Sequence, residues 1–147
     1  MRVLSPRLHG YLDFVMIAIF VLAPLTIGLG GLPALISYVL AVVHLLMTLM
    51  TRFPAGIVKT IPLMVHGLVE LAVAIFLVLL PYIAGFGPGS PAKRFYVFMA
   101  AVVFIVWPLT DFRGSGSPNQ AENAGNGRQD KPPTEQRRRV RAAGNQR

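Results

Sequence analysis

The sequence predicts an all-α membrane protein with four transmembrane helices, arranged as two parallel two-helix hairpin repeats and followed by a disordered basic tail. Three observations lead to this fold class. The chain of 147 residues is 54% hydrophobic and only 14% charged, whereas a soluble domain is about 25% charged. Its apolar residues fall into four long stretches, and a sequence pattern that opens on His9 returns 57 residues later at His66.

The returning pattern covers 22 aligned positions, of which seven are identical. Residues 9–30 read HGYLDFVMIAIFVLAPLTIGLG, and residues 66–87 read HGLVELAVAIFLVLLPYIAGFG. Both copies open on His-Gly, and Asp13 of the first aligns with Glu70 of the second. A shared period of this length indicates one supersecondary unit that is used twice.

Each copy of this unit contributes two of the four apolar stretches, and a membrane-crossing helix needs about 20 mostly apolar residues. The expected spans run from about Tyr11 to Gly30, from Pro33 to Met50, from Pro62 to Gly85 and from Phe95 to Thr110, the last being the shortest. No stretch has the polar outer face that a helix of a soluble bundle requires. The sequence therefore predicts a transmembrane domain over residues 1–112, with repeat 1 at about 9–53 and repeat 2 at about 66–112.

The connections support two hairpins that point the same way across the membrane. Glycines and a proline fill residues 28–33 and residues 86–91, where they end one helix and start the next. Basic residues near the span ends indicate the cytoplasmic side. Most of them belong to the N-terminus, the 51–61 linker and the C-terminal side, namely Arg2, Arg7, Arg52, Lys59 and Arg113. The opposite side has Lys93 and Arg94 in the second turn. We expect a multi-pass protein of the bacterial inner membrane with both termini cytoplasmic. The repeats are then related by a pseudo-two-fold axis along the membrane normal.

The tail, residues 113–147, differs from the rest of the chain in composition. It holds eight Lys and Arg against three Asp and Glu. Such a segment cannot bury a core and is expected to be disordered. Beside membrane lipids in general, its basic cluster at residues 137–141 favours contact with anionic lipid, and a nucleic-acid partner is less favoured. Assembly into a homo-oligomer is left open.

The repeat architecture, the paired His-Gly starts and the aligned prolines resemble the SPW-repeat family of small bacterial membrane proteins. The Ser-Pro-Trp motif of that family stands here as Ala23-Pro24-Leu25 and as residues 80–82, Leu-Pro-Tyr. The resemblance covers residues 9 to about 112. It implies an integral membrane protein without established chemistry, so it supports a fold and no mechanism.

The candidate polar or ion site consists of ionisable residues inside or just before the first and third spans, namely His9, Asp13, His66 and Glu70. Residues four apart share a helix face, and intramembrane ionisable groups usually face the protein interior. Two imidazoles and two carboxylates suit a divalent metal such as zinc, or a proton relay. The simpler interpretation, which we favour from sequence alone, is a hydrogen bond within each His–carboxylate pair near a helix start.

A second polar position is His44, which precedes Met47 and Met50 at spacings of three. Such soft ligands suit Cu(I), but His44 has no counterpart in the second repeat, and a hydrogen bond to a neighbouring helix is the favoured interpretation. The chain has no cysteine, so thiolate sites are excluded, and it shows no phosphate-binding loop, dinucleotide motif or serine triad. We expect a non-enzymatic membrane protein with a structural or accessory role and no cofactor; the alternative is a small cation or proton transporter or channel that uses the paired His–carboxylate residues.

Overall fold

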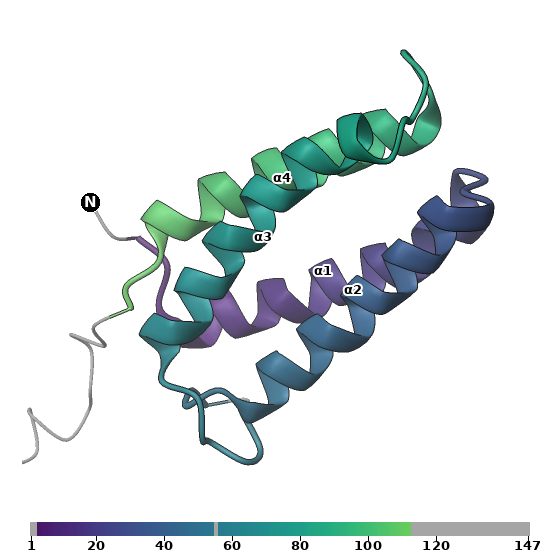
Figure 1. The fold of residues 1–147 in the computed structure, drawn as a ribbon. Coiled ribbons are helices and arrows are strands. Elements are labelled where there is room, and N and C mark those ends of the chain that lie inside the picture. The colour runs from purple at the N-terminus through teal and green to yellow at the C-terminus, as the bar shows by residue number, and fades with distance from the viewer. Residues whose placement is uncertain (1–2, 55, 113–147) are drawn as a thin grey trace, which may run out of the picture. The chain divides into compact units, whose positions relative to one another are not determined.

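The structure is a computed structural model that describes residues 3–54 and 56–112. Within these residues it contains four α-helices, in the order α1 Pro6–Thr26, α2 Gly31–Met50, α3 Leu63–Ile83 and α4 Pro91–Leu109 (Figure 1). All four are long and apolar enough to cross a membrane. The expectation of an all-helical, multi-pass membrane protein is thus confirmed. The predicted disordered tail at 113–147 lies outside the described residues.

Two helices begin earlier than the hydropathy of the sequence indicates. Helix α1 begins at Pro6 because the Ser5 side chain accepts a hydrogen bond from the N–H of Leu8, and α4 begins at Pro91 because Ser90 accepts one from the N–H of Lys93. A capping serine followed by proline at the first helical position is a strong start signal. Basic residues in these first turns lower the local hydropathy, which is why the expected spans began too late.

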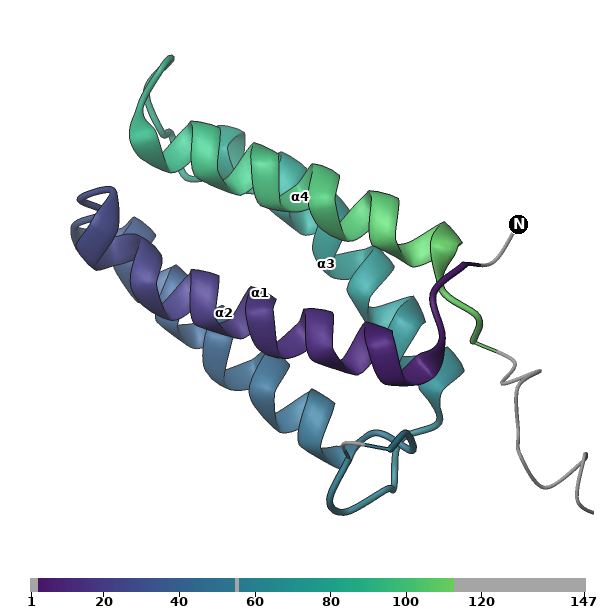
Figure 2. The ribbon, with the colours of Figure 1, turned by 180° about the vertical axis from the view of Figure 1, so that it is seen from behind.

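The helices pair as α1 with α2 and α3 with α4, which is where the closest packing occurs. Figures 1 and 2 show the turns of both hairpins at one end of the helices, and the starts of α1 and α3 at the other. Each turn contains a glycine in the left-handed region, Gly28 with φ 69° and Gly85 with φ 67°. Glycine takes this conformation without steric cost, so the two hairpins end their first helices in the same way.

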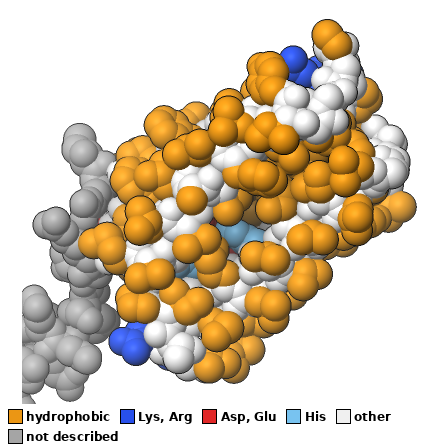
Figure 3. All heavy atoms as spheres, in the orientation of Figure 1, with side chains coloured by type: hydrophobic (Ala, Val, Ile, Leu, Met, Phe, Trp, Pro, Cys, Tyr) orange, Lys and Arg blue, Asp and Glu red, His pale blue; other side chains and the backbone are white. Residues whose placement is uncertain are grey.

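Polarity is distributed as expected in a lipid environment. Large apolar side chains cover the outer face in Figure 3, and some, such as Leu25 at 78% and Ile83 at 75%, are mostly exposed. The ionisable residues His9, Asp13 and His66 are instead completely or almost completely buried. The apolar core fills the space from these polar residues toward the turns; it includes Met16, Phe20, Leu77, Phe95 and Met99.

A buried hydrogen bond compensates for the proline inside α1. Pro24 has no N–H to donate to the carbonyl of Phe20 one turn earlier. The hydroxyl of Ser37 on α2 donates to that carbonyl at 2.7 Å. Membrane helices need such neighbours because lipid offers no hydrogen bonds to a freed carbonyl. The bend at Pro24 is therefore supported by the adjacent helix of the same hairpin.

Short extended segments connect the helices at the end opposite the hairpin turns, which we call the polar end because the buried ionisable residues lie near it. Leu4 pairs with Thr110, and Thr51 pairs with Ile61, in isolated parallel bridges. The N–H of Asp111 donates to the carbonyl of Leu4 at 2.9 Å, and in the same manner the N–H of Arg52 donates to Ile61 at 2.8 Å. These bonds place a threonine that follows α4 beside the start of α1, and a threonine that follows α2 beside the start of α3.

Candidate metal centre

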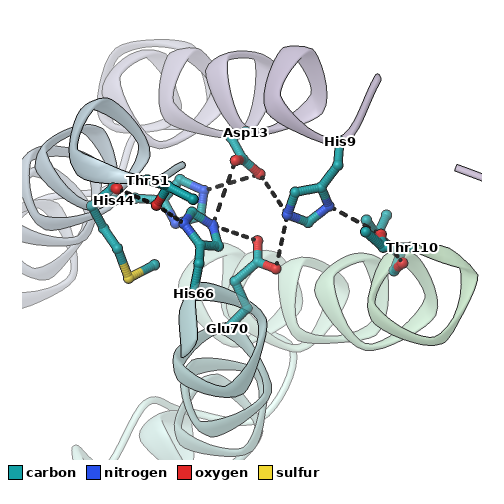
Figure 4. Close-up of polar contacts among 9 residues, drawn as sticks. His9, Asp13, His44, Thr51, His66, Glu70 and Thr110 are labelled. Atoms are coloured by element: carbon teal, nitrogen blue, oxygen red, sulfur yellow. Dashed lines mark hydrogen bonds and ion pairs between the residues drawn. The ribbon is translucent and has the colours of Figure 1, made fainter. Parts of the chain in front are cut away.

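Four buried ionisable side chains meet between α1 and α3 at the polar end of the protein. We call them the His–carboxylate cluster: His9, Asp13, His66 and Glu70. In each helix the histidine is the fourth residue and the carboxylate the eighth. With a rise of 1.5 Å per residue, the cluster lies about 5–10 Å from the helix starts. Figure 4 shows the four side chains pointing toward one another from the two helices.

The distances inside the cluster are nearly uniform. Nε2 of His9 lies 3.6 Å from Asp13 Oδ1 and 3.3 Å from Glu70 Oε2. Nε2 of His66 lies 3.5 Å from Asp13 Oδ2 and 3.6 Å from Glu70 Oε1. Each imidazole therefore faces both carboxylates, and the shortest of these contacts joins α1 to α3 rather than residues of one helix. Within each His–carboxylate pair of one helix the N–O separation is 3.6 Å, which is a contact longer than the expected hydrogen bond.

The other ring nitrogen of each histidine is held by a threonine. Thr110 Oγ1 lies 3.1 Å from Nδ1 of His9, and Thr51 Oγ1 lies 2.8 Å from Nδ1 of His66. Each threonine hydroxyl also donates its single hydrogen to a carbonyl four residues earlier, at 2.9 Å for Thr110 and 2.6 Å for Thr51. The oxygen can then only accept from the ring, so Nδ1 carries a proton, and in the neutral imidazole Nε2 presents a lone pair to the cluster.

These lone pairs face carboxylate oxygens without a hydrogen bond between them. The buried atoms that lack a hydrogen-bond partner include Nε2 of both cluster histidines, Asp13 Oδ2 and Glu70 Oε2. Leaving polar atoms unpaired in a low-dielectric interior is costly. A proton on Nε2 would make a charge-assisted hydrogen bond, but such bonds are about 2.7–2.9 Å long, shorter than every N–O separation observed.

The donor atoms of the cluster suit a metal ion, and their separations are close to those of a metal site. Zinc bonds to imidazole nitrogen and carboxylate oxygen at about 2.0–2.2 Å, so a tetrahedron of such bonds has edges of about 3.3–3.6 Å. The N–O separations of the cluster are 3.3–3.6 Å, but they involve both oxygens of each carboxylate, so a tetrahedral site would use one of the two oxygens of Asp13 and one of Glu70. One donor atom from each residue lies within 4.8 Å of all the others. The threonines supply the outer hydrogen bonds that orient metal-ligating histidines in known sites.

The glycine after each cluster histidine makes room for an aromatic ring. A Cβ at Gly10 would overlap the ring of Phe53, and a Cβ at Gly67 would overlap the ring of Phe112. Phe112 also packs edge-on against the His9 ring, with centroids 5.8 Å apart. The repeated glycine therefore has a steric reason, because each one leaves room for a phenylalanine ring, and the ring next to Gly67 also contacts His9.

His44 approaches the cluster from α2. Its Nε2 lies 3.7 Å from Asp13 Oδ1 and has no hydrogen-bond partner, and its ring lies edge-on to His66 with centroids 5.9 Å apart. This contact reaches a neighbouring helix, as expected for His44, but it is longer than a hydrogen bond. Met50 is 38% exposed, and the Thr51 hydroxyl bonds to the backbone carbonyl of Met47. The His44 ring contacts Asp13 and His66 of the cluster.

Sequence reasoning missed the two residues that hold the imidazoles. Thr51-Arg52-Phe53 and the later triplet Thr110-Asp111-Phe112 make equivalent contacts, yet they stand 59 residues apart. The His-Gly pairs stand 57 apart, so an alignment fixed at that period misplaces the second triplet by two residues. A search for a Thr-x-Phe triplet after each even-numbered span would have found both.

Comparison with known proteins does not identify the function of this site. No protein-family model, no curated protein and no solved structure matches the chain. The resemblance to the SPW-repeat family therefore stays a prediction, and the function is argued from the geometry of the cluster.

Proposed function

We propose that this protein is a non-enzymatic integral membrane protein that binds one divalent transition-metal ion of the zinc class at the His–carboxylate cluster. The observation that carries the proposal is the orientation of the two imidazoles. Thr51 and Thr110 contact Nδ1 and so turn both Nε2 atoms toward the carboxylates, 3.3–3.6 Å away. In the neutral imidazoles these Nε2 atoms carry lone pairs. A cation between these atoms turns their mutual repulsion into coordination bonds.

Charge balance supports a divalent ion. Asp13 and Glu70 are the only acidic residues within the four helices. With two neutral imidazoles, a doubly charged cation makes the buried site neutral. Neutrality matters because an uncompensated charge inside a membrane protein is expensive. Oxygen-only ions such as Mg²⁺ gain little from imidazole, whereas zinc and its neighbours bind it well.

The surroundings of the cluster favour holding an ion over conducting it. The core between the cluster and the hairpin turns is apolar, with Phe20, Leu77 and Met99 among its buried residues. Two polar side chains there, Ser37 and Tyr96, donate to backbone carbonyls. A conducting path needs polar or water-filled surroundings along its length. We therefore infer a metal that ties α1 to α3, and a transporter or channel is the weaker candidate.

The test is the metal content of the purified protein. Wild-type protein in detergent, incubated with Zn²⁺ and dialysed against metal-free buffer, is expected to retain one equivalent of zinc. The double variant His9→Ala/His66→Ala and the isosteric double variant Asp13→Asn/Glu70→Gln are expected to retain none. Size-exclusion chromatography checks that each variant keeps its fold.

The matched control is Ser37→Ala, which removes a buried hydroxyl near Phe20, away from the cluster. It is expected to retain the full equivalent of zinc. Equal zinc in wild-type protein and both double variants, or no zinc in wild-type protein, would contradict the proposal.

The orientation of the protein in the membrane and its relation to the SPW-repeat family belong to the same proposal. The equivalent contacts of the two hairpins support two parallel repeats, in line with the SPW-repeat resemblance. Parallel repeats put the starts of α1 and α3 on one side, and the basic residues Arg7, Arg52 and Lys59 near that end favour the cytoplasm of a bacterial cell. The metal would then be bound near the cytoplasmic surface of the inner membrane.

A further inference from the structure

We infer that the chain between α2 and α3, residues 51–62, binds the headgroup of an anionic phospholipid. We call this segment the α2–α3 linker. Its two basic residues, Arg52 and Lys59, contact the phosphate, and its exposed apolar side chains enter the lipid beside it. The linker holds no acidic residue. Among the residues that the structure describes, neither Arg52 nor Lys59 forms an ion pair, and both are exposed. The inference does not rest on the proposed metal site.

Backbone hydrogen bonds fix the position of the α2–α3 linker relative to the end of α2. The N–H groups of Ile57 and Val58 donate to the carbonyl of Leu49 at 2.8 and 3.1 Å. The N–H of Ile61 donates at 2.8 Å to the carbonyl of Met50, the last residue of the helix. The linker, which Figure 1 shows as the loop between α2 and α3, therefore returns to the last turn of α2 and stays close to the membrane.

Two apolar side chains of the linker are exposed at the level where the membrane span ends. Ile57 is 74% exposed and Val58 is 62% exposed. Both residues are hydrogen-bonded to Leu49, one residue before the end of α2, so they lie at the boundary between hydrocarbon and headgroups. Removing apolar surface from water is favourable, and at this boundary apolar side chains insert among the acyl chains.

The basic residues of the linker lie at the level of the lipid phosphates. Arg52 is two residues beyond the end of α2, which is at most about 7 Å of chain, and each headgroup region of a bilayer is about 5–8 Å thick. Nε of Arg52 donates to the carbonyl of Lys59 at 2.8 Å, so the guanidinium lies against the backbone of the second basic residue. Its other N–H donors suit the oxygens of a phosphate.

The backbone at Lys59 gives an independent reason to assign a role to its side chain. Lys59 has φ 51°, in the left-handed region, and among the described residues it is the one non-glycine with a positive φ. Glycine takes this conformation without steric cost, whereas other residues in it are strained and are found most often at functional sites. A lysine at a position that favours glycine is explained if its ammonium group binds a ligand.

The experiment counts bound lipids by native mass spectrometry of the full chain. Protein in detergent is mixed with equal amounts of dioleoyl phosphatidylglycerol and dioleoyl phosphatidylcholine, which share acyl chains and differ in headgroup charge. Wild-type protein is expected to retain phosphatidylglycerol preferentially. Arg52→Gln/Lys59→Gln should lower the ratio of phosphatidylglycerol-bound to phosphatidylcholine-bound protein about tenfold or more, because each basic residue near an anionic surface contributes about a factor of five.

A matched variant removes the same charge from the other end of the helices. Lys93→Gln/Arg94→Gln changes the start of α4, where Nζ of Lys93 already lies 4.4 Å from the centroid of the Tyr82 ring. This variant should keep the wild-type ratio. Lys59→Gly is a second test: it should lower the ratio without lowering the midpoint of thermal unfolding, because glycine is unstrained at φ 51°.

The absence of a phosphatidylglycerol preference in wild-type protein would overturn the inference, and so would an unchanged ratio in Arg52→Gln/Lys59→Gln. An equal fall in Lys93→Gln/Arg94→Gln would refute it as well, because the preference would then be a general attraction between opposite charges. Displacement of the lipid by inorganic phosphate at constant ionic strength would show an anion site in which the lipid has no part. Should the double variant fail to fold, Lys59→Gly carries the test, and a wild-type ratio there would contradict the contact of Lys59 with the phosphate.

Discussion

The two threonines offer the sharpest test of how the site is built. Thr51→Val keeps the shape of the side chain but removes the oxygen that lies 2.8 Å from Nδ1 of His66. Outer hydrogen bonds to metal-ligating histidines are typically worth 10–100-fold in metal affinity. At 1.4 kcal/mol for each factor of ten, the expected loss is about 1.4–2.8 kcal/mol of binding free energy.

The structure supplies a control one turn away. Thr48 is on the same helix and completely buried, and its hydroxyl has no hydrogen-bond partner. Thr48→Val should therefore leave the affinity unchanged. Thr110→Val should match Thr51→Val, because its oxygen lies 3.1 Å from Nδ1 of His9. Thr51→Ser, which retains the oxygen, should bind as wild type does.

The assay is competition titration of Zn²⁺ against a chromophoric chelator, with protein in detergent. Affinity rather than thermal stability is the readout, because Thr51 also bonds to the carbonyl of Met47 and its loss weakens the end of α2 without any metal. If Thr51→Val and Thr48→Val lower the affinity equally, the hydroxyl does not orient the imidazole. The assignment of the lone pair on Nε2 would then be wrong.

Three further predictions follow from the packing and the topology. Gly10→Ala should lower the free energy of unfolding by about 1–3 kcal/mol in a detergent denaturation assay, because the new methyl overlaps the Phe53 ring; Gly87→Ala, where a Cβ meets nothing within 4 Å, should be neutral, and equal effects would refute the clash. Ser37→Ala should cost about 1–3 kcal/mol in the same assay by orphaning the Phe20 carbonyl, and much less in a Pro24→Ala background that restores an N–H donor; an equal cost in both backgrounds would break the link to the proline. Alkaline phosphatase fused after Pro54 should be inactive and after Gly87 active, since Arg52 and Lys59 favour the cytoplasm; the reverse pattern would invert the proposed orientation.

The helices could be predicted from the sequence because hydropathy alone distinguishes a membrane span of about 20 residues. The first turns of α1 and α4 could not be predicted in this way. Arg7 in α1 and the Lys93–Arg94 pair in α4 lower the hydropathy, while Ser5 and Ser90 act through capping bonds that a hydropathy window ignores. The start of a membrane helix is decided by hydrogen bonding of its free N–H groups, so capping residues deserve the same weight as apolar length.

The sequence predicted which residues form the cluster but not how their imidazole rings are turned. Spacing of four residues placed each histidine on the face of its carboxylate, and the repeat suggested that the two faces meet. What sequence could not give is the rotation of each imidazole, which decides whether Nε2 or Nδ1 faces the carboxylates. Thr51 and Thr110 determine that rotation, and each of them belongs to the other hairpin than the histidine it contacts. Without them, a hydrogen bond within each pair is the simpler expectation.

The way the hairpins share the site explains why neither suffices alone. Helices α1 and α3 each contribute one histidine and one carboxylate, and a single pair offers two ligands where zinc takes four. The supporting bonds also cross between hairpins, since Thr110 after α4 orients His9 of α1, and Thr51 after α2 orients His66 of α3. A change at the end of α4 therefore alters a cluster histidine on α1. A bound cation would stabilise the association of the two hairpins rather than either hairpin by itself. Ligand linkage makes this stabilisation rise with the free metal concentration, to about 2.7 kcal/mol when that concentration is a hundred times the dissociation constant.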